Sequence, residues 1–289
     1  MVAAVNTKSD AKKTFKSLLI EHKGEITPEV KEALENLVQL SANERGGDGD
    51  AEWSPAFDLK INRGRWRSIT TPPFPGKLHD DDDDADGRSR FTLGRMSFGM
   101  FKPTKIVCAV DEIINIVEQL IKNEEGDNQQ GRDGDIPAWT QSYIMEALID
   151  IETSSSTKLP ARIVTCGVCW PQSPTRLGVT FNRGTLEPRF DLSSPENVSL
   201  SALWKETFHN VIAKEAEARS YLGKFGTYLM HLLMKGIIGL AVPMDSSDFT
   251  QTYSMESPFA GHSDILYIDE DLRVSRGNKG TISVVERIA

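Results

Sequence analysis

The sequence predicts a mostly β protein: a closed antiparallel β-barrel with an N-terminal helical region and a helical insertion. Three observations favour this class. Several runs alternate apolar and polar residues with a period of two, Gly, Pro and Asn separate these runs, and two other stretches follow a helical period. Many short consecutive strands are typical of a closed antiparallel barrel, because closure removes exposed sheet edges.

Residues 10–42 are predicted to be helical. Phe15, Leu18 and Leu19 fall on one helical face, and a second apolar set follows after a break at Gly24. Thr27 followed by Pro28 is a typical helix start. We therefore expect two short helices near the start of the chain.

A linker is expected between the helices and the barrel. From Asn43 to Pro55 the composition turns to Gly, Asp and Glu with few apolar residues. The prediction is an N-terminal helical region at 1–45 and a barrel domain at 55–289, whose body starts near Phe57.

The predicted strands lie in the second part of the chain. Tyr143, Met145, Ala147, Ile149 and Ile151 alternate on one face, as Leu177, Val179 and Phe181 do on another. Further runs that fit a strand are Arg90–Phe101, Lys105–Val110, Ala161–Trp170, Phe249–Met255, Ile265–Ile268 and Thr281–Ile288. Two stretches break this rhythm: Asp111–Lys122 has helical spacing, although its Ile and Val content leaves a strand open, and 200–240 reads as a helical insertion.

The composition excludes some functions. Among 289 residues, 39% are hydrophobic, so the chain can bury a core, and 42 acidic against 33 basic residues give a net charge of -9. This charge argues against a dedicated nucleic-acid binder.

The three cysteines, Cys108, Cys166 and Cys169, indicate a reducing compartment. Cys166 and Cys169 lie in a strand-like run on opposite faces, so we expect buried thiols and no zinc site, with redox sensing as the alternative.

Catalytic motifs are weak in this sequence. There is no Gly-rich phosphate loop, no dinucleotide fingerprint and no nucleophile elbow, so we expect no catalytic residues and no cofactor. The acidic run Asp80–Asp84, followed by Asp86, lacks the spacing of a calcium loop and is expected to be a solvated loop. His262 is expected in a surface loop. The sequence therefore favours a binding protein, and an enzyme on the same barrel is disfavoured.

The closing segment carries the most specific pattern. Leu266–Ile288 reads as a strand, an acidic turn at Asp269–Asp271, a second strand, a turn at Gly277–Gly280 and a last strand. The segment resembles the end of the plastid lipid-associated (fibrillin) proteins, which combines a Tyr, an acidic turn, an Arg-bearing strand and an Arg-Gly-Asn-basic-Gly turn. The residues that fit are Tyr267, Asp269, Glu270, Asp271, Arg273, Arg276, Gly277, Asn278 and Gly280.

A second segment shares this resemblance. Gly64–Arg67 is similar to the Gly-x-Trp-Arg strand of the family and to the Gly-x-Trp of lipocalins, whereas Ser68–Pro75 departs from the family pattern. In lipocalin-like barrels this Trp closes the base and an Arg from the last strands stacks on it. The candidates for that partner of Trp66 are Arg273, Arg276 and Arg287.

The resemblance implies a lipocalin-like barrel that binds or carries a lipid, quinone or carotenoid-type molecule, in the plastid and peripheral to thylakoids or plastoglobules. No transit peptide is evident in the first residues, so a targeting segment is either missing or absent. The residues expected to bind the ligand or close the barrel are Trp66, Arg67, Tyr267, Asp269, Asp271, Arg273 and Arg276. No catalytic step, metal or cofactor is expected.

The insertion allows a different function. On a helical wheel of Tyr221–Leu240, Lys224, His231 and Lys235 form one stripe opposite an apolar side. Such a helix either caps the barrel or lies on a membrane surface. The alternative to a lipid carrier is therefore a structural or assembly protein bound to a photosynthetic membrane or complex.

Overall fold

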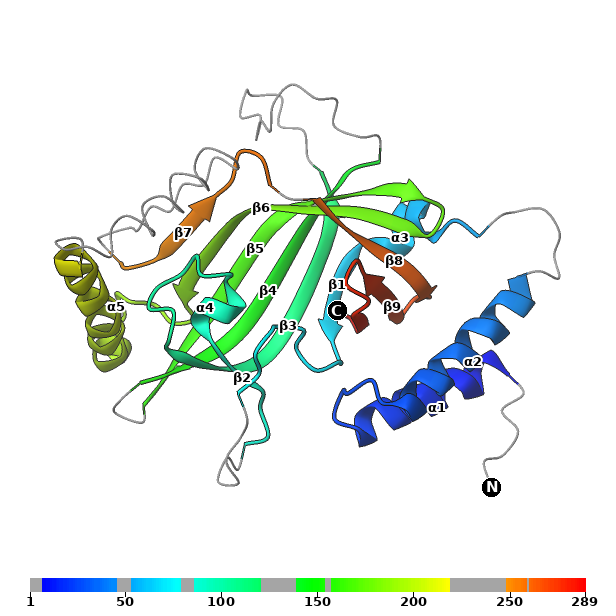
Figure 1. Cartoon of the computed structure of the whole chain (residues 1–289), viewed down its shortest axis with the longest axis horizontal. Coiled ribbons are helices and arrows are strands. Elements are labelled where there is room, and N and C mark those ends of the chain that lie inside the picture. Colours follow the sequence, from blue (N-terminus) through cyan, green and yellow to red (C-terminus); the bar gives the residue numbers. More distant parts are fainter. Residues whose placement is uncertain are drawn as a thin grey trace.

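The computed structural model describes most of the chain and shows an antiparallel sheet flanked by helices (Figure 1). The described residues are 7–45, 53–78, 86–120, 139–153, 157–218, 248–258 and 260–289.

The strands form a closed ring. Eight of them follow the order β1-β10-β9-β8-β6-β5-β4-β3, and β1 pairs with both β10 and β3, so the sheet returns to its first strand. β2 extends the sheet beside β3, and β7 pairs with β6. Their bounds are β1 Gly64–Ser68, β2 Arg90–Thr92, β3 Val107–Gln119, β4 Gln141–Glu152, β5 Lys158–Ser173, β6 Arg176–Pro188, β7 Gln251–Ser254, β8 Ala260–Ile268, β9 Leu272–Gly277 and β10 Ile282–Ile288. The prediction of a mostly antiparallel β protein with helices is confirmed.

The N-terminal helices cover the outside of the ring. α1 (Lys8–Glu21) and α2 (Pro28–Arg45) form an antiparallel pair whose apolar faces pack on the outer face of β8, β9 and β10 (Figure 1). Gly24 joins them with a φ of +82°, which favours glycine. α2 begins at the expected Thr27-Pro28 step, where the Val30 amide donates to the Thr27 hydroxyl at 3.4 Å.

Two expected elements differ from the structure. The helical spacing of Asp111–Lys122 is misleading, because this segment lies within β3, and the strand alternative is correct. Its five residues 113–117 are all buried, and a strand buried on both faces loses the simple alternation of a half-buried one. The single strand expected at Arg90–Phe101 is also wrong, because β2 ends at Thr92 and the short helix α4 (Leu93–Met96) follows.

The inner face of the sheet is packed at two ends. At one end, α4, β2, β7 and the helix α5 (Val198–Ala218) cover the sheet, and Trp204 and Phe208 of α5 are buried there. At the other end, the short helices η1 (Pro55–Phe57) and α3 (Leu59–Asn62) cover Trp66 and its apolar neighbours. A further short helix, η2 (Pro195–Asn197), precedes α5.

The helix α5, Val198–Ala218, lies in the first part of the insertion predicted at 200–240. The predicted basic helix with Lys224, His231 and Lys235 lies outside the described residues. Within the described part of the chain, no helix has both the length and the apolar character needed to cross a membrane.

Candidate functional site

Trp66 lies at the closure of the ring. It is fully buried on β1, opposite Arg287 of β10 on one side and Asn115 of β3 on the other. Its indole N–H donates to the backbone carbonyl of Asn62, at the end of α3, at 3.0 Å. The side chain is therefore held by both the sheet and the preceding helix.

Two guanidinium groups contact the Trp66 ring. The guanidinium carbon of Arg287 lies 4.1 Å from the indole centre, and that of Arg273 lies 5.0 Å away. The expected stacking of an arginine on this Trp is therefore present, from two of the three candidates. Arg287 donates to the carbonyls of Ile61, at 2.7 Å, and of Arg63 and Glu270.

Arg273 points into the ring. Its neighbours on β9, Leu272 and Val274, face outward under the N-terminal helices, so alternation places Arg273 on the inner face, where only 5% of it is exposed. Burial lowers the pKa of its guanidinium, and the nearby Tyr143 hydroxyl partly opposes this effect. Tyr143 belongs to β4, on the far side of the ring, so Arg273 reaches across the interior.

Tyr143 lies between Arg273 of β9 and Asn115 of β3 and contacts both. Its hydroxyl donates to Asn115 Oδ1 at 2.9 Å, and burial raises the pKa of this hydroxyl. The Tyr143 ring also lies 5.5 Å from that of Phe181. The hydroxyl of Tyr143 thus has polar contacts, whereas its ring packs against an apolar side chain.

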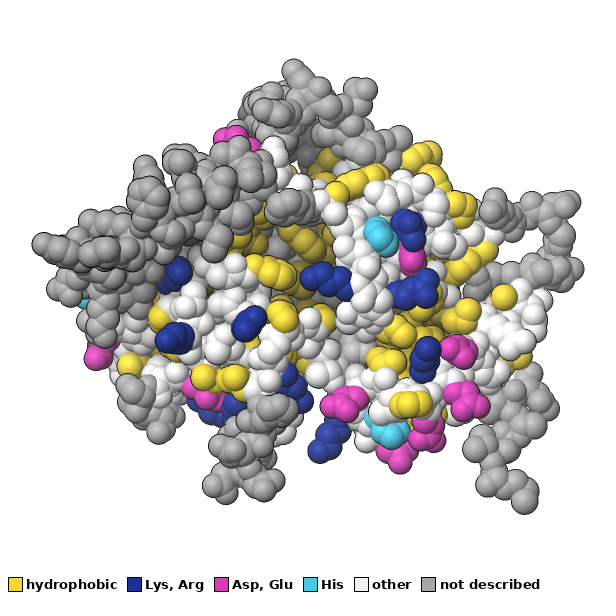
Figure 2. Space-filling model, in the orientation of Figure 1, with side chains coloured by type: hydrophobic (Ala, Val, Ile, Leu, Met, Phe, Trp, Pro, Cys, Tyr) yellow, Lys and Arg dark blue, Asp and Glu magenta, His cyan; other side chains and the backbone are white. Residues whose placement is uncertain are grey.

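The inner wall between the two packed ends is apolar and only half-buried. Tyr143 and Met145 of β4 and Val179 and Phe181 of β6 share the inner face, and each keeps partial exposure. Figure 2 shows a hollow lined by hydrophobic side chains in the region where Figure 1 places β3 to β5. The interior therefore offers apolar surface next to the Trp66 and Arg273 end.

Three of the expected site residues lie outside the ring instead. Tyr267 is buried under α1 and donates to Asp269, and Lys12 of α1 pairs with Asp269 at 2.8 Å and also with Asp271. Burial alone would raise the pKa of Asp269, but the hydrogen bonds from Lys12 and Tyr267 lower it to about 2. This cluster fastens the first helix to the sheet.

The remaining two expected residues are exposed. Arg67 of β1 faces outward near Glu112 and Glu286, both at 3.8 Å. Arg276 of β9 pairs with Asp264 at 3.6 Å. The structure therefore brings together only Trp66 and Arg273 from the expected set.

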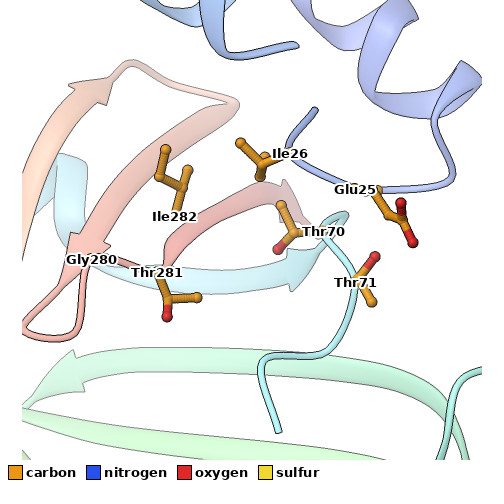
Figure 3. Close-up of a pocket in the computed structure, with 8 residues that line it drawn as sticks. Glu25, Ile26, Thr70, Thr71, Gly280, Thr281 and Ile282 are labelled. Carbon is orange, nitrogen blue, oxygen red and sulfur yellow. The ribbon is translucent and has the colours of Figure 1, made fainter. Parts of the chain in front are cut away.

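A separate shallow pocket of about 370 Å³ lies where the helices meet the sheet (Figure 3). The turn between α1 and α2, the residues after β1 and the turn between β9 and β10 form its walls. The lining residues are Gly24, Glu25, Ile26, Thr70, Thr71, Gly280, Thr281 and Ile282. None of the expected site residues takes part in it.

The cysteines, the acidic run and His262 were the other candidates in the sequence. The three cysteines are free thiols, and burial raises the pKa of Cys108 to about 12 and of Cys169 to about 11. No group of metal-ligating side chains occurs among the residues that the structure describes.

Asp86 joins Arg88 and Lys158 in ion pairs, whereas the run Asp80–Asp84 lies outside the described residues. His262 is not in a loop: β8 extends back to Ala260, and His262 pairs with Gly178 of β6.

Two polar residues of the interior were missed as site residues. Asn115 is the one amide in an Ile- and Val-rich run, and Tyr143 carries the one hydroxyl on its alternating apolar face. A polar group that interrupts an apolar face is a signal that the sequence does contain. The partner that such a polar side chain contacts across the ring cannot be identified without the strand order.

These features define a class: an antiparallel β protein whose sheet closes into a ring, with an apolar interior and a helical outer cover. The PAP_fibrillin family model matches residues 154–286, which run from just before β5 into β10. This match supports the resemblance of the closing segment to the PAP/fibrillin family. The proteins of that family are plastid lipid-associated. Searches of curated proteins and of solved structures found no match.

Proposed function

We propose that the protein binds or carries an apolar lipid, quinone or carotenoid-type molecule inside a lipocalin-like barrel, without catalysing a reaction. The site of action is a plastid membrane, peripheral to thylakoids or plastoglobules. The observation that carries the proposal is the half-buried apolar wall of Tyr143, Met145, Val179 and Phe181, between two packed ends of the ring.

Burial of apolar ligand surface supplies the binding free energy. Each 100 Å² of apolar ligand surface removed from water contributes about 2.5 kcal/mol, so a long hydrocarbon chain can offset the cost of association. Ligand sites of this kind are mostly apolar with a few polar groups that fix orientation. Arg273 supplies such a group at one end of the wall, and Trp66 and Tyr143 position it.

The first experiment is native mass spectrometry of the purified protein, followed by solvent extraction. We expect an apolar molecule to co-purify, or a delipidated sample to take up lipids or prenylquinones. If neither occurs, the carrier function is wrong.

A matched pair of variants locates the bound molecule. Met145→Trp fills the interior from β4, whereas Ile144→Trp places the same bulk on the outer face of that strand. We expect the first to weaken ligand binding at least tenfold and the second to leave it unchanged. Equal effects would place the ligand elsewhere.

A second candidate is a structural or assembly protein on a photosynthetic membrane or complex. Two large apolar side chains favour it, since Phe98 is 79% exposed and Trp139 is 59% exposed. Replacing each with Ser should reduce liposome flotation or complex binding if that side chain makes the contact. The predicted basic helix is tested by Lys224→Glu with Lys235→Glu, which should reduce flotation on anionic vesicles.

A further inference from the structure

Arg273 is a buried cation for which the described part of the chain provides no acidic partner. The structure describes two buried arginines, and the other one, Arg90, pairs with Glu152 at 2.8 Å and with Asp86 at 3.2 Å. Among the described residues, no carboxylate forms an ion pair with Arg273, whose neighbours are Trp66, Tyr143, Cys169 and Arg287. The two buried arginines therefore differ in charge balance.

This imbalance is costly. An uncompensated buried charge is destabilising by several kcal/mol, and a stacked aromatic ring offsets only part of that cost. Arg287 increases it, because a second positive group contacts the same indole. An anion that enters the ring would remove the penalty, and the gain would appear as binding energy.

The surroundings define the chemistry of that anion. A guanidinium presents parallel N–H donors that match one carboxylate. The Tyr143 hydroxyl, which donates to Asn115, lies beside this guanidinium and helps to position it. The wall that continues from this point, with Met145 and Phe181, is apolar. The site thus combines one charged contact with a hydrocarbon surface.

We propose that Arg273 anchors the carboxylate of a long-chain amphiphile, of the fatty acid class, whose hydrocarbon chain lies along Tyr143, Met145 and Phe181. The inference rests on the proposed function and narrows it to an acidic ligand. Trp66 and the Tyr143 hydroxyl hold the guanidinium in place.

The test compares oleate with methyl oleate, which has the same chain but no charge. Affinities are measured by displacement of a fluorescent fatty-acid probe from the delipidated full chain, for the unmodified protein, Arg273→Gln and Arg162→Gln. Arg162 lies on the outer face of β5 and pairs with Glu187 at 2.5 Å, so it controls for the loss of one arginine. Far-ultraviolet circular dichroism and urea unfolding check that each variant folds.

We expect the unmodified protein to bind oleate at least tenfold more tightly than methyl oleate. Arg273→Gln should remove this preference by weakening oleate while methyl oleate is unchanged, and Arg162→Gln should behave like the unmodified protein. Equal affinities in the unmodified protein would overturn the anchor and leave the carrier function standing. Failure to bind either molecule, or any lipid or prenylquinone, would overturn both. If Arg273→Gln does not fold, the two ligands on the unmodified protein still decide.

Discussion

Trp66 and Arg287 face each other across β1 and β10, and the Arg287 guanidinium stacks on the Trp66 indole at 4.1 Å. The same guanidinium donates to backbone carbonyls of Ile61, Arg63 and Glu270. One side chain thus connects the helix before β1, the strand β1 and the acidic turn before β9. We expect this connection to determine how firmly the ring is closed.

Arg287→Lys should lower the free energy of unfolding by about 1–3 kcal/mol, because an ammonium cannot reach three carbonyls in a planar fork or stack as a guanidinium does. Urea unfolding followed by circular dichroism measures the loss. Arg162→Lys, on the outer face of β5, is the control and should cost under about 0.5 kcal/mol. Equal losses would show that the Arg287 contacts do not secure the ring.

The attachment of α1 through Lys12, Tyr267 and Asp269 should weaken at acid pH. The pKa of Asp269 is lowered to about 2, so its stabilising contribution is complete above about pH 4 and is lost as the pH falls toward 2. The loss amounts to about 2 kcal/mol at most. The protection of the amides of residues 8–21 against hydrogen exchange, relative to their intrinsic rate at each pH, should therefore fall over this interval. Lys12→Met should flatten that dependence, and an unchanged profile would contradict the role of this pair.

Gly24→Ala should destabilise the helical cover. A Cβ at this position would lie 2.8 Å from the Thr71 amide nitrogen and 2.9 Å from the Ile69 carbonyl oxygen, and the φ of +82° adds strain. We expect a loss of about 2–4 kcal/mol, measured by urea unfolding. Gly87→Ala is the matched control, because Gly87 also has a positive φ but no atom within 4 Å of the added Cβ. It should cost about 1–2 kcal/mol, and a similar loss in both variants would contradict the close approach.

The cysteines should differ in reactivity. Burial raises the pKa of Cys108 and Cys169, so little thiolate forms at neutral pH, whereas Cys166 is partly exposed. Iodoacetamide at pH 7.5 should label Cys166 first in the folded protein and all three cysteines in urea. Peptide mass spectrometry identifies the labelled sites. Rapid labelling of Cys108 in the folded state would contradict the packing at that end of the ring.

Local patterns in the sequence were sufficient for much of the fold. Alternation along β4 and the turn residues around β9 depend on near neighbours, so both could be predicted. β3 could not, because its residues 113–117 are buried on both faces and their apolar spacing also fits a helix. The extent of β8 was also missed, because its first part is a strand only through pairing with β6.

The site was predicted less completely for a similar reason. The stacking of arginines on Trp66 followed from a resemblance, but the sequence did not show which arginines face inward. Arg273 and Arg276 are three positions apart on one strand, so they lie on opposite faces, and only the strand pairing decides which face is inside. Tyr267, Asp269 and Asp271 belong to the same motif but serve the attachment of α1.

The closure of the sheet also has a consequence for the order of folding. β1 has five residues and joins β10 to β3, and the Arg287 contact with Arg63 connects positions 224 apart. Ordering so long an intervening chain costs entropy before the contact is made, whereas the hairpins of β3 to β6 form between adjacent segments. The meander of β3 to β6 should therefore assemble first as an open sheet. A late kinetic phase, slowed by changes at Trp66 or Arg287, would then mark the step that encloses the interior.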